Sequence, residues 1–560
     1  MGDEPFSLLR QAWLPVRRGS GKVECIRPAE LNDKIDIDPV VAFAWPRADF
    51  DAASRELLIG LLATACWCKT DEDEWERWWH DPPDPAELDR HFTPIEAAFL
   101  LDGSGPRFMQ DQDELTGDAV PVAGLLIDSP GANAIKRNTD IFVKRGRAAQ
   151  LGRPGAAMAL FTLMIFAPSG GAGHRTSLRG GGPTTTLLLP TLDSSGAPRS
   201  LWHQLWANVS WNPRWPDPLA TLEGVFPWLA PTRVSDKGRK TTPDDVHPAQ
   251  CYWGMPRRIR LNFAPNEDGK PCALTGEVDS VVVPDYRTRP HGNDYKGWSQ
   301  GHPLSPYYRQ KPTNLEWLPV HPQPGRLGYQ DWVGLVVGDS DDTERSLRLP
   351  AEAVSVAKTR LRRQQVHGAR LLASGYDMDN MKARGFVESY MPVRFVAPAM
   401  RESYDAAARE FVFGAREAER ILSYAVRAAL FGNGNAAADA GDRRLVRDRF
   451  WEDTEQPFHD AVAQLASDLE AAATDEALER AVLNEAPRHW YVILKQAVLR
   501  LFDARVPFDA LGGPKAERIV KARRDLRNAL AGYGRSGTAF FNALRLPLPE
   551  PTKPKSKVPQ

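Results

Sequence analysis

Cysteine is scarce in this sequence, and long apolar runs are missing. The five cysteines among 560 residues are odd in number and contain no C-x-x-C pair, so neither a disulfide framework nor a structural zinc site is predicted. No apolar stretch reaches the roughly 18 residues that indicate a membrane-spanning helix. The first residues, MGDEPFSLLRQ, do not have the pattern of a signal peptide. We therefore expect a soluble, cytoplasmic protein that contacts no membrane.

An excess of charge of either sign is also missing, since the formal net charge is −1. Any surface for nucleic acid must therefore be local. The length exceeds what one compact core supports, which favours two or three domains. The 17 tryptophans and 47 prolines indicate a loop-rich body packed around aromatic side chains.

The common catalytic motifs are not present either. Gly19–Val23 (GSGKV) has a lysine, but Val23 stands where a P-loop needs serine or threonine. Neither a G-x-S-x-G elbow nor an H-E-x-x-H zinc helix occurs. No cluster of metal-ligand type has suitable spacing. We predict no cofactor and no metal, and nothing in the sequence supports an enzyme.

What stands out instead is a glycine-rich stretch at 167–186, APSGGAGHRTSLRGGGPTTT. Glycine tolerates positive φ and close backbone approach, so such a loop presents bare amides to an anion or a groove. From Ile141 to Leu192 the sequence contains several Lys and Arg residues but no Asp or Glu. This local basic bias favours a nucleic-acid contact over a plain surface loop, because phosphates are bound by clustered Lys and Arg.

The fold class predicted from periodicity is α+β, with a large irregular mixed N-terminal domain followed by a C-terminal four-helix bundle. Early elements are a strand pair at 13–18 and 22–26 and a helix at 51–67. A further helix is predicted at 351–373, before a polar connector. The predicted divisions are an α+β domain at 1–370, a connector at 371–397, a bundle at 398–546 and a disordered tail at 547–560.

Two other polar features have ordinary explanations as well as functional ones. The last bundle helix carries a basic patch, and some of its charge belongs on a solvated face. The patch comprises Lys515, Arg518, Lys521 and Arg524. The connector contains Asp377–Lys382 (DMDNMK), which alone reads as a turn.

Several short motifs occur in an order and spacing that resemble a known family. They are WLPVR from Trp13, WPRAD from Trp45, RFMQ from Arg107, IFV from Ile141, SLRGGGPTT from Ser177, Gly375-Tyr376, and RFW from Arg449. Together they span more than 400 residues, from Trp13 to Trp451. The chain resembles the CasA family, the large subunit of the type I-E CRISPR surveillance complex Cascade.

The resemblance implies a non-catalytic subunit of an RNA-guided complex for antiviral defence. Such a subunit recognises the protospacer-adjacent motif (PAM) in double-stranded DNA and helps open the duplex for R-loop formation. Its implied partners are the crRNA-bearing Cascade subunits, double-stranded target DNA and a helicase–nuclease effector. In this family a glycine loop, a lysine finger and a polar wedge approach the minor groove, whose narrow width suits a glycine backbone.

Carried over by position, the glycine loop implies DNA contacts at its first turn: Ser169, Gly170, Gly171, Ala172 and Gly173. Arg175 and Arg179 are further candidate DNA contacts, although the segment from Arg179 to Thr185 is also expected to hold the loop in place. The wedge falls on Asp379, Asn380 and Met381. Asp379 departs from the uncharged family pattern, so Asn380 and Met381 are favoured.

The lysine finger does not transfer, because Val281 stands where a lysine is expected. We expect Lys296, Arg287 or Arg289 to take the place of the lysine finger. The resemblance also implies a contact with guide RNA or its protein cap at Phe142, with Val143, Lys144, Arg145 and Arg147 beside it.

Two other interpretations stay open at this point. One is a stand-alone nucleic-acid-processing enzyme whose site lies in the insertion at His291–His302. The other is a helical scaffold whose bundle only docks a partner.

Overall fold

The structure of the chain is a computed structural model. It describes residues 4–141, 145–171, 173–191, 199–310, 316–323, 327–338, 346–366, 368–379, 382–432, 440–506 and 514–550. The chain divides into two compact units. Unit 1 comprises 1–326 and 340–390, and unit 2 comprises 327–339 and 391–560. The segment 327–338, which falls within the predicted first domain, therefore packs with the C-terminal helices.

Unit 1 mixes short helices with several small sheets. Its helices are α1 (Ala48–Ala65), α2 (Glu72–His80), α3 (Pro85–Phe92), α4 (Ala132–Lys136), α5 (Arg153–Phe166), α6 (Leu201–Trp206), α7 (Leu222–Val225) and α8 (Glu352–Arg363). Its strands are β1 (Leu14–Arg18), β2 (Val23–Ile26), β3 (Val40–Phe43), β4 (Val120–Pro121), β5 (Leu151–Gly152), β6 (Thr185–Pro190), β7 (Arg258–Pro265), β8 (Val281–Arg289), β9 (Tyr307–Gln310), β10 (Leu318–Pro319), β11 (Ser346–Leu349), β12 (Ala369–Asp379) and β13 (Lys382–Val393), the last of which continues into unit 2.

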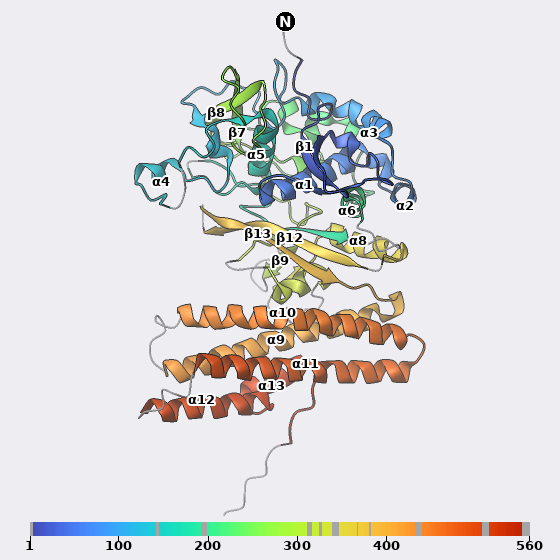
Figure 1. The fold of residues 1–560 in the computed structure, drawn as a ribbon, viewed down its shortest axis with the longest axis vertical. Coiled ribbons are helices and arrows are strands. Elements are labelled where there is room, and N and C mark those ends of the chain that lie inside the picture. The colour runs from blue at the N-terminus through green and yellow to red at the C-terminus, as the bar shows by residue number, and fades with distance from the viewer. Residues whose placement is uncertain are drawn as a thin grey trace, which may run out of the picture. The chain divides into compact units, whose positions relative to one another are not determined.

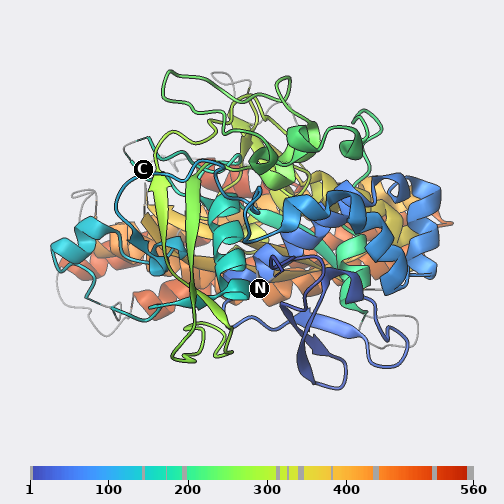
Figure 2. The same cartoon turned by 90° about the horizontal axis from the view of Figure 1, so that it is seen from above.

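The sheets are small and their recorded pairings are antiparallel. The strand orders are β2-β1-β3, β10-β9-β11, β13-β12-β6 and β4-β8-β5, with β7 also paired to β8. Figure 2 shows β7 and β8 running side by side next to α5. The central strand β8 runs from Val281 to Arg289 and pairs with β4, β5 and β7. The predicted strand pair at 13–26 is confirmed as β1 and β2.

The core of unit 1 is built on tryptophan, as the composition indicated. Asp71 caps α2 by accepting a hydrogen bond from the amide of Glu74, and the helix then buries Trp75, Trp78 and Trp79 on one face. Trp75 and Trp206 each donate an indole N–H to the other's carbonyl, at 2.9 and 3.0 Å. The buried indoles are thus hydrogen-bonded, which burial of a polar group requires.

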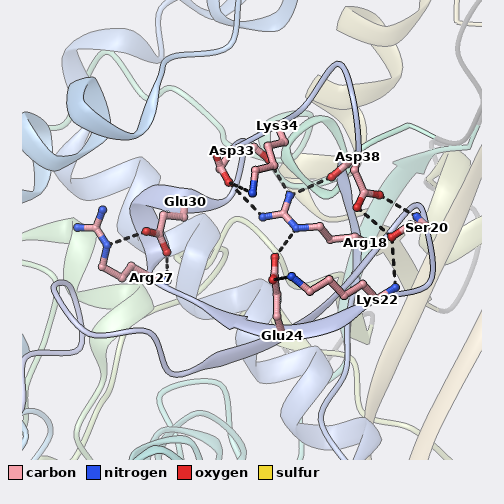
Figure 3. A network of polar contacts seen from close by, with 9 residues as sticks. All are labelled: Arg18, Ser20, Lys22, Glu24, Arg27, Glu30, Asp33, Lys34 and Asp38. Atoms are coloured by element: carbon pink, nitrogen blue, oxygen red, sulfur yellow. Dashed lines mark hydrogen bonds and ion pairs between the residues drawn. The ribbon is translucent and has the colours of Figure 1, made fainter.

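A buried arginine fastens the loop between β2 and β3. Figure 3 shows Arg18 among the acidic side chains of this segment. Its guanidinium donates to the carbonyls of Asp33 and Asp38 at 2.8 and 2.9 Å and pairs with Glu24. Arg18 is 3 % exposed, so these partners replace the water that it loses on folding.

The prediction of a single helix at 351–373 is correct only for its first part. α8 ends at Arg363, and from Ala369 the chain is strand β12. Leu371 and Leu372 pair with Leu188 and Leu187 of β6, so this apolar run is a buried strand. The predicted connector with a wedge loop is consequently a β-hairpin of β12 and β13, whose tip at 380–381 lies outside the described residues.

Unit 2 is helical, and its long helices lie side by side (Figure 1). They are α9 (Arg401–Leu430), α10 (Ala440–Ala471), α11 (Glu476–Arg505) and α12 (Pro514–Leu530), followed by the shorter α13 (Gly534–Ala543). The four predicted bundle helices are confirmed. α13 is an additional helix that packs on α9 and α12.

The core of unit 2 also includes residues of the segment 327–338. Tyr329 stacks on Phe458 of α10 with ring centroids 4.5 Å apart and hydrogen-bonds Thr454 at 2.7 Å. Trp490 of α11 lies beside both rings and donates to the carbonyl of Phe411 in α9 at 2.9 Å. An apolar stripe at helical spacing on each helix thus meets one aromatic cluster.

Candidate nucleic-acid interface

The glycine-rich stretch is a loop that leaves the end of α5 and returns into β6. Its first turn is accessible: Gly170 is exposed, and Ser169, Gly171 and Gly173 are half-buried. Its return, Gly182–Thr185, is buried. The amide of Ser177 donates to the carbonyl of Ala167 at 3.1 Å, and that of Gly182 donates to Phe166 at 3.0 Å. The loop is therefore closed on the helix end from which it starts. We call residues 169–173 the tip.

A buried ion pair anchors the return of the loop. Arg179 donates to Glu56 of α1 at 2.7 Å, and the two side chains are 2 % and 3 % exposed. Arg179 also donates to the hydroxyls of Thr185 and Ser305, at 2.9 and 3.2 Å, while the Thr185 hydroxyl donates to Glu56. Arg179 was predicted as a DNA contact and also as part of the loop's support. The structure places it in the support, because its donors are turned inward onto protein oxygens.

The hairpin and the glycine loop share one base. A Cβ placed at Gly182 would lie 2.7 Å from the carbonyl oxygen of Tyr376 in β12, and its φ is +64°. The ring of Tyr376 meets those of Phe166 and Phe386 at 5.7 and 5.1 Å. Its hydroxyl donates to Asp49 of α1. Two elements that the sequence placed about 200 residues apart are thus held together by glycine and aromatic packing.

The tip has a backbone that suits glycine and a cation beneath it. Gly171 and Gly173 have φ of +66° and +86°, and a Cβ at Gly173 would lie 2.5 Å from the His291 ring. Arg257 donates to the carbonyl of Pro168, and a Cβ at Gly170 would lie 2.5 Å from its Nη1. A side chain is therefore disfavoured at Gly171 by backbone conformation, at Gly170 by the Arg257 guanidinium, and at Gly173 by both conformation and the His291 ring.

Arg257 is the residue that sequence reasoning missed. It is 8 % exposed, its Nε has no hydrogen-bond partner, and it forms no ion pair with the described residues. Burial lowers the pKa of Arg257 to about 10, so it remains a cation at neutral pH. Burial together with the charges of Arg257 and His291 lowers the pKa of His174. The tip is therefore underlain by one unneutralised positive charge.

The acid-free run of sequence is largely neutralised in space. Acids from outside the run pair with its arginines: Arg145 with the adjacent Asp140, and, from distant segments, Arg153 with Asp279, Arg175 with Asp294 and Arg179 with Glu56. Among the described residues, no partner is recorded for Arg147, which is exposed. The basic bias read from the sequence therefore overestimates the free charge. Arg175 is half-buried, and its guanidinium also binds Ser235 at 3.0 Å.

A basic turn lies next to the tip, because the amide of Ser235 donates to the carbonyl of His291, whose own amide donates to the carbonyl of Gly173. Ser235, which Arg175 binds, begins a turn that contains the exposed Lys237, Arg239 and Lys240. Lys240 pairs with Asp294 at 2.6 Å. The exposed Lys296 donates its amide to the carbonyl of Thr241 at 3.1 Å, so this predicted substitute for the lysine finger lies beside the turn. The other two candidates, Arg287 and Arg289, are exposed on β8, and Arg289 donates to the Thr116 hydroxyl.

The wedge residues can be placed only in part. Asn380 and Met381, like Ala172 of the tip, lie outside the described residues. Asp379 is mostly exposed and lies 3.8 Å from Arg384 across the hairpin. Arg384 also pairs with Asp377 at 2.7 Å, and its pKa is raised chiefly by the hydrogen bond to Asp377. The carboxylate that departs from the family pattern is thus partly neutralised by its own hairpin.

The predicted RNA contacts and the bundle patch are also only partly described. Phe142, Val143 and Lys144 lie outside the described residues, and Arg145 is exposed but paired with Asp140. In the bundle, Arg518 donates to the carbonyls of Ala429 and Leu430 at 2.9 Å each. It thereby caps α9 rather than lying free in a patch, as expected for a cation at a helix C-terminus. Lys521 and Arg524 are exposed, Arg524 lies 3.5 Å from Asp525, and the Lys515 backbone belongs to α12.

The insertion at His291–His302 alternates buried residues, at 292–295, Trp298 and His302, with exposed ones such as Lys296. His302 is 2 % exposed, accepts a hydrogen bond from the amide of Leu304 at 3.2 Å and packs on Tyr252. Burial, with the charge of Arg179, lowers the pKa of His302 well below its usual value. In the described part of the chain, no group of three or more His, Cys, Asp or Glu residues has the arrangement of a metal site. Nor does any described helix have the length and apolarity needed to cross a membrane.

Comparison with known proteins decides the family. The profile of the family described as CRISPR-associated protein Cse1 matches residues 7–501. The chain belongs to this family. The family likeness noted in the sequence motifs is thereby confirmed over most of the chain.

Solved structures of Cse1 proteins have the same fold. Cse1 of Thermobifida fusca is similar with a TM-score of 0.66 at 18% identity, covering 97% of this chain and 98% of that one. CasA (Cse1) of Thermus thermophilus has a TM-score of 0.62 at 16% identity, covering 94% and 100%. A chain of a CRISPR RNA-guided surveillance complex has a TM-score of 0.58 at 14% identity, covering 93% and 99%. The similarity extends over both units of the chain.

Proposed function

We propose that this Cse1 family member is the large, non-catalytic subunit of a type I-E Cascade surveillance complex. It associates with the crRNA-bearing subunits, recognises a PAM in double-stranded target DNA, and helps open the duplex for R-loop formation. It then recruits the helicase–nuclease. The five cysteines are free thiols, which suits the reducing cytoplasm. Family membership and the similarity to a chain of an RNA-guided surveillance complex support this role.

The glycine tip over Arg257 is the observation that supports DNA recognition best. A narrow groove admits backbone where it excludes large side chains, and negative potential in such a groove attracts a cation. The tip offers half-buried to exposed glycine backbone with positive φ at Gly171 and Gly173, and the guanidinium of Arg257 lies directly beneath it. The basic turn at Lys237 and Arg239 and the loop at Lys296 supply phosphate contacts beside the groove.

Duplex opening is proposed for the β12–β13 hairpin. Its base touches the glycine loop at Gly182 and Tyr376, so a duplex bound at the tip lies next to the hairpin. The proposed insertion of Asn380 and Met381 between base pairs follows the way in which proteins unstack DNA from the minor groove. Arg384 reduces the repulsion that Asp379 would exert on phosphates.

The decisive experiment uses the reconstituted complex carrying wild-type or Gly171→Asp subunit. Gly171→Asp places a carboxylate at the tip, so PAM-dependent duplex binding in a mobility-shift assay is expected to fall at least tenfold while the subunit still co-elutes with the complex. Gly269→Asp is the matched control. Gly269 has a similar φ of +59° and nothing within 4 Å of an added Cβ, so it carries the same backbone strain away from the tip.

The remaining arms test the other parts of the proposal. Permanganate reactivity of the displaced strand reports R-loop opening, and co-precipitation of the helicase–nuclease reports recruitment. Equal binding by the Gly171→Asp and Gly269→Asp complexes contradicts tip recognition. Metal-dependent cleavage of DNA by the lone chain, abolished by His291→Ala, supports the enzyme interpretation instead.

A further inference from the structure

A cavity in unit 1, apart from the glycine loop, gathers three arginines. Its volume is about 250 Å³. Its walls come from β3, α1, the end of β6, the start of α6, β12 and β13, and the polar side chains among its lining are Arg55, Arg199, Arg370, Gln204, Thr191 and Tyr390. Neither the family comparison nor the DNA-recognition proposal uses this cavity.

Arg55 lies at its wall with donors that the protein leaves unused. The residue is 7 % exposed, and its Nε and Nη1 are shielded from solvent without a hydrogen-bond partner. Its recorded packing is against the ring of Phe43, 5.8 Å from the centroid. An unpaired buried donor on a cation costs free energy unless something in the site accepts from it. Arg55 therefore has two donors available for a hydrogen-bond acceptor bound in the cavity.

The two other arginines extend the positive charge toward the surface. Arg370 is exposed and stacks on Tyr390 at 5.3 Å, and within the described residues it forms no ion pair. Arg199 is half-buried and stacks on Trp79 at 5.3 Å. The carboxylates recorded as interacting with Arg55 or Tyr390 are Asp51 and Glu388. Arg55 and Arg370 each keep a guanidinium without an ion pair among the described residues, so these two side chains supply the positive charge of the cavity.

We propose that this cavity binds a phosphate group, with Arg55 at the inner end and Arg370 at the entrance. Guanidinium forks match phosphate oxygens in pairs of hydrogen bonds, which chloride or a carbonyl cannot use in the same way. The volume lies below the range usual for drug-sized ligands, so the site suits a free phosphate or one terminal nucleotide rather than a longer segment. Gln204 and Tyr390 add neutral polar groups to the wall.

The test measures phosphate binding by the full-length chain. Inorganic phosphate is titrated by calorimetry, and the thermal midpoint is followed in phosphate and in chloride of equal ionic strength, because a ligand of the folded state raises that midpoint. Wild type is expected to bind and to gain stability. Arg370→Gln is expected to raise the dissociation constant for phosphate about tenfold or more, because one charged hydrogen bond is lost. Arg17→Gln, an exposed arginine of β1 outside the cavity, is the matched control.

Arg55→Gln separates a ligand role from a structural one. If Arg55 binds the phosphate, the thermal midpoint of this variant does not rise in phosphate. Its thermal midpoint in chloride then equals or exceeds that of wild type. A lower midpoint in chloride together with unchanged phosphate affinity means that Arg55 serves the fold, which overturns the proposal. Because Arg370 is exposed, its variant gives an answer even where Arg55→Gln does not fold.

The source of the phosphate is distinguished with two short single-stranded DNA oligonucleotides of one sequence, one 5′-phosphorylated and one with a 5′-hydroxyl. Binding of inorganic phosphate and of both oligonucleotides to the same extent assigns a general phosphate site. Binding of the phosphorylated strand alone assigns a site for a nucleic-acid end. No binding of any probe above chloride, or equal binding by Arg370→Gln and Arg17→Gln, overturns the proposal. PAM-dependent binding by the complex does not enter this test, so the two proposals fail separately.

Discussion

Replacing Arg179 with methionine removes one charge from a pair that water does not reach. Glu56 is then buried without its cation, and the hydroxyl of Ser305 loses its charged partner. Removing one partner of a buried ion pair usually costs about 3–5 kcal/mol, since the remaining charge is left uncompensated. We expect a loss of this size in the free energy of unfolding of unit 1, seen as a lower urea midpoint.

The double variant Glu56→Gln/Arg179→Met provides the matched control. It removes both charges and keeps similar volumes, and such replacements are often close to neutral, so its free energy of unfolding should lie within about 2 kcal/mol of the wild-type value. The reconstituted complex with the double variant should also retain most of its duplex binding. The two single variants and the double variant together form a cycle that isolates the pair's coupling.

The opposite pattern would refute the anchoring role. If Arg179 contacts phosphate, Arg179→Met unfolds at the wild-type urea concentration while duplex affinity falls. The slope of log affinity against log salt then also decreases by about one, since one phosphate contact has been lost. The double variant would in that case bind DNA as poorly as the single one.

Two further variants test other parts of unit 1. Gly182 has a φ of +64°, and a Cβ there would lie 2.7 Å from the Tyr376 carbonyl oxygen, so Gly182→Ala should lower the free energy of unfolding by about 2 kcal/mol. Gly269→Ala, whose Cβ meets nothing within 4 Å, should cost clearly less. Equal thermal midpoints for the two variants would contradict the contact. Asp51 has its pKa raised by burial from 3.8 to about 6, so the ionised form is disfavoured in the folded state and wild-type stability should fall as pH rises from about 4 to 6. Asp51→Asn keeps an oxygen for the Trp45 amide and should remove that part of the pH dependence in urea titrations; an unchanged profile would contradict it.

Local pattern predicted the helical unit well and the loop chemistry only in part. The positions Phe411, Ala415, Ala418 and Leu422 recur at helical spacing and are buried in α9, because a long amphipathic helix carries its own signal. α13 was missed, since its GRSGT start has the composition of a turn. The start of β12 was predicted as helix because short apolar runs fit both periods, and its pairing with β6 depends on residues almost 200 positions away.

The partners of charged residues could not be predicted from local sequence. Glu56 lies 123 positions from Arg179, and the stretch without acids gave no sign that distant carboxylates neutralise it. Arg257 was missed for the same reason, since Arg257-Arg258 looks uniform in sequence. In the structure Arg258 pairs with Asp111 whereas Arg257 forms no ion pair with the described residues. Charge in a sequence is counted along the chain, but its effect depends on contacts made across the fold.

The common base of the glycine loop and the hairpin bears on how fast a duplex can be engaged. Phe166, Tyr376 and Phe386 fix the two elements to each other when unit 1 folds. The conformational entropy of arranging them is therefore lost once, during folding, and not again at each encounter with DNA. The PAM search proposed above would require many brief encounters, and a pre-arranged pair would let each of them proceed directly from groove contact to strand separation. A subunit whose loop and hairpin moved independently would have to wait for them to align at every site.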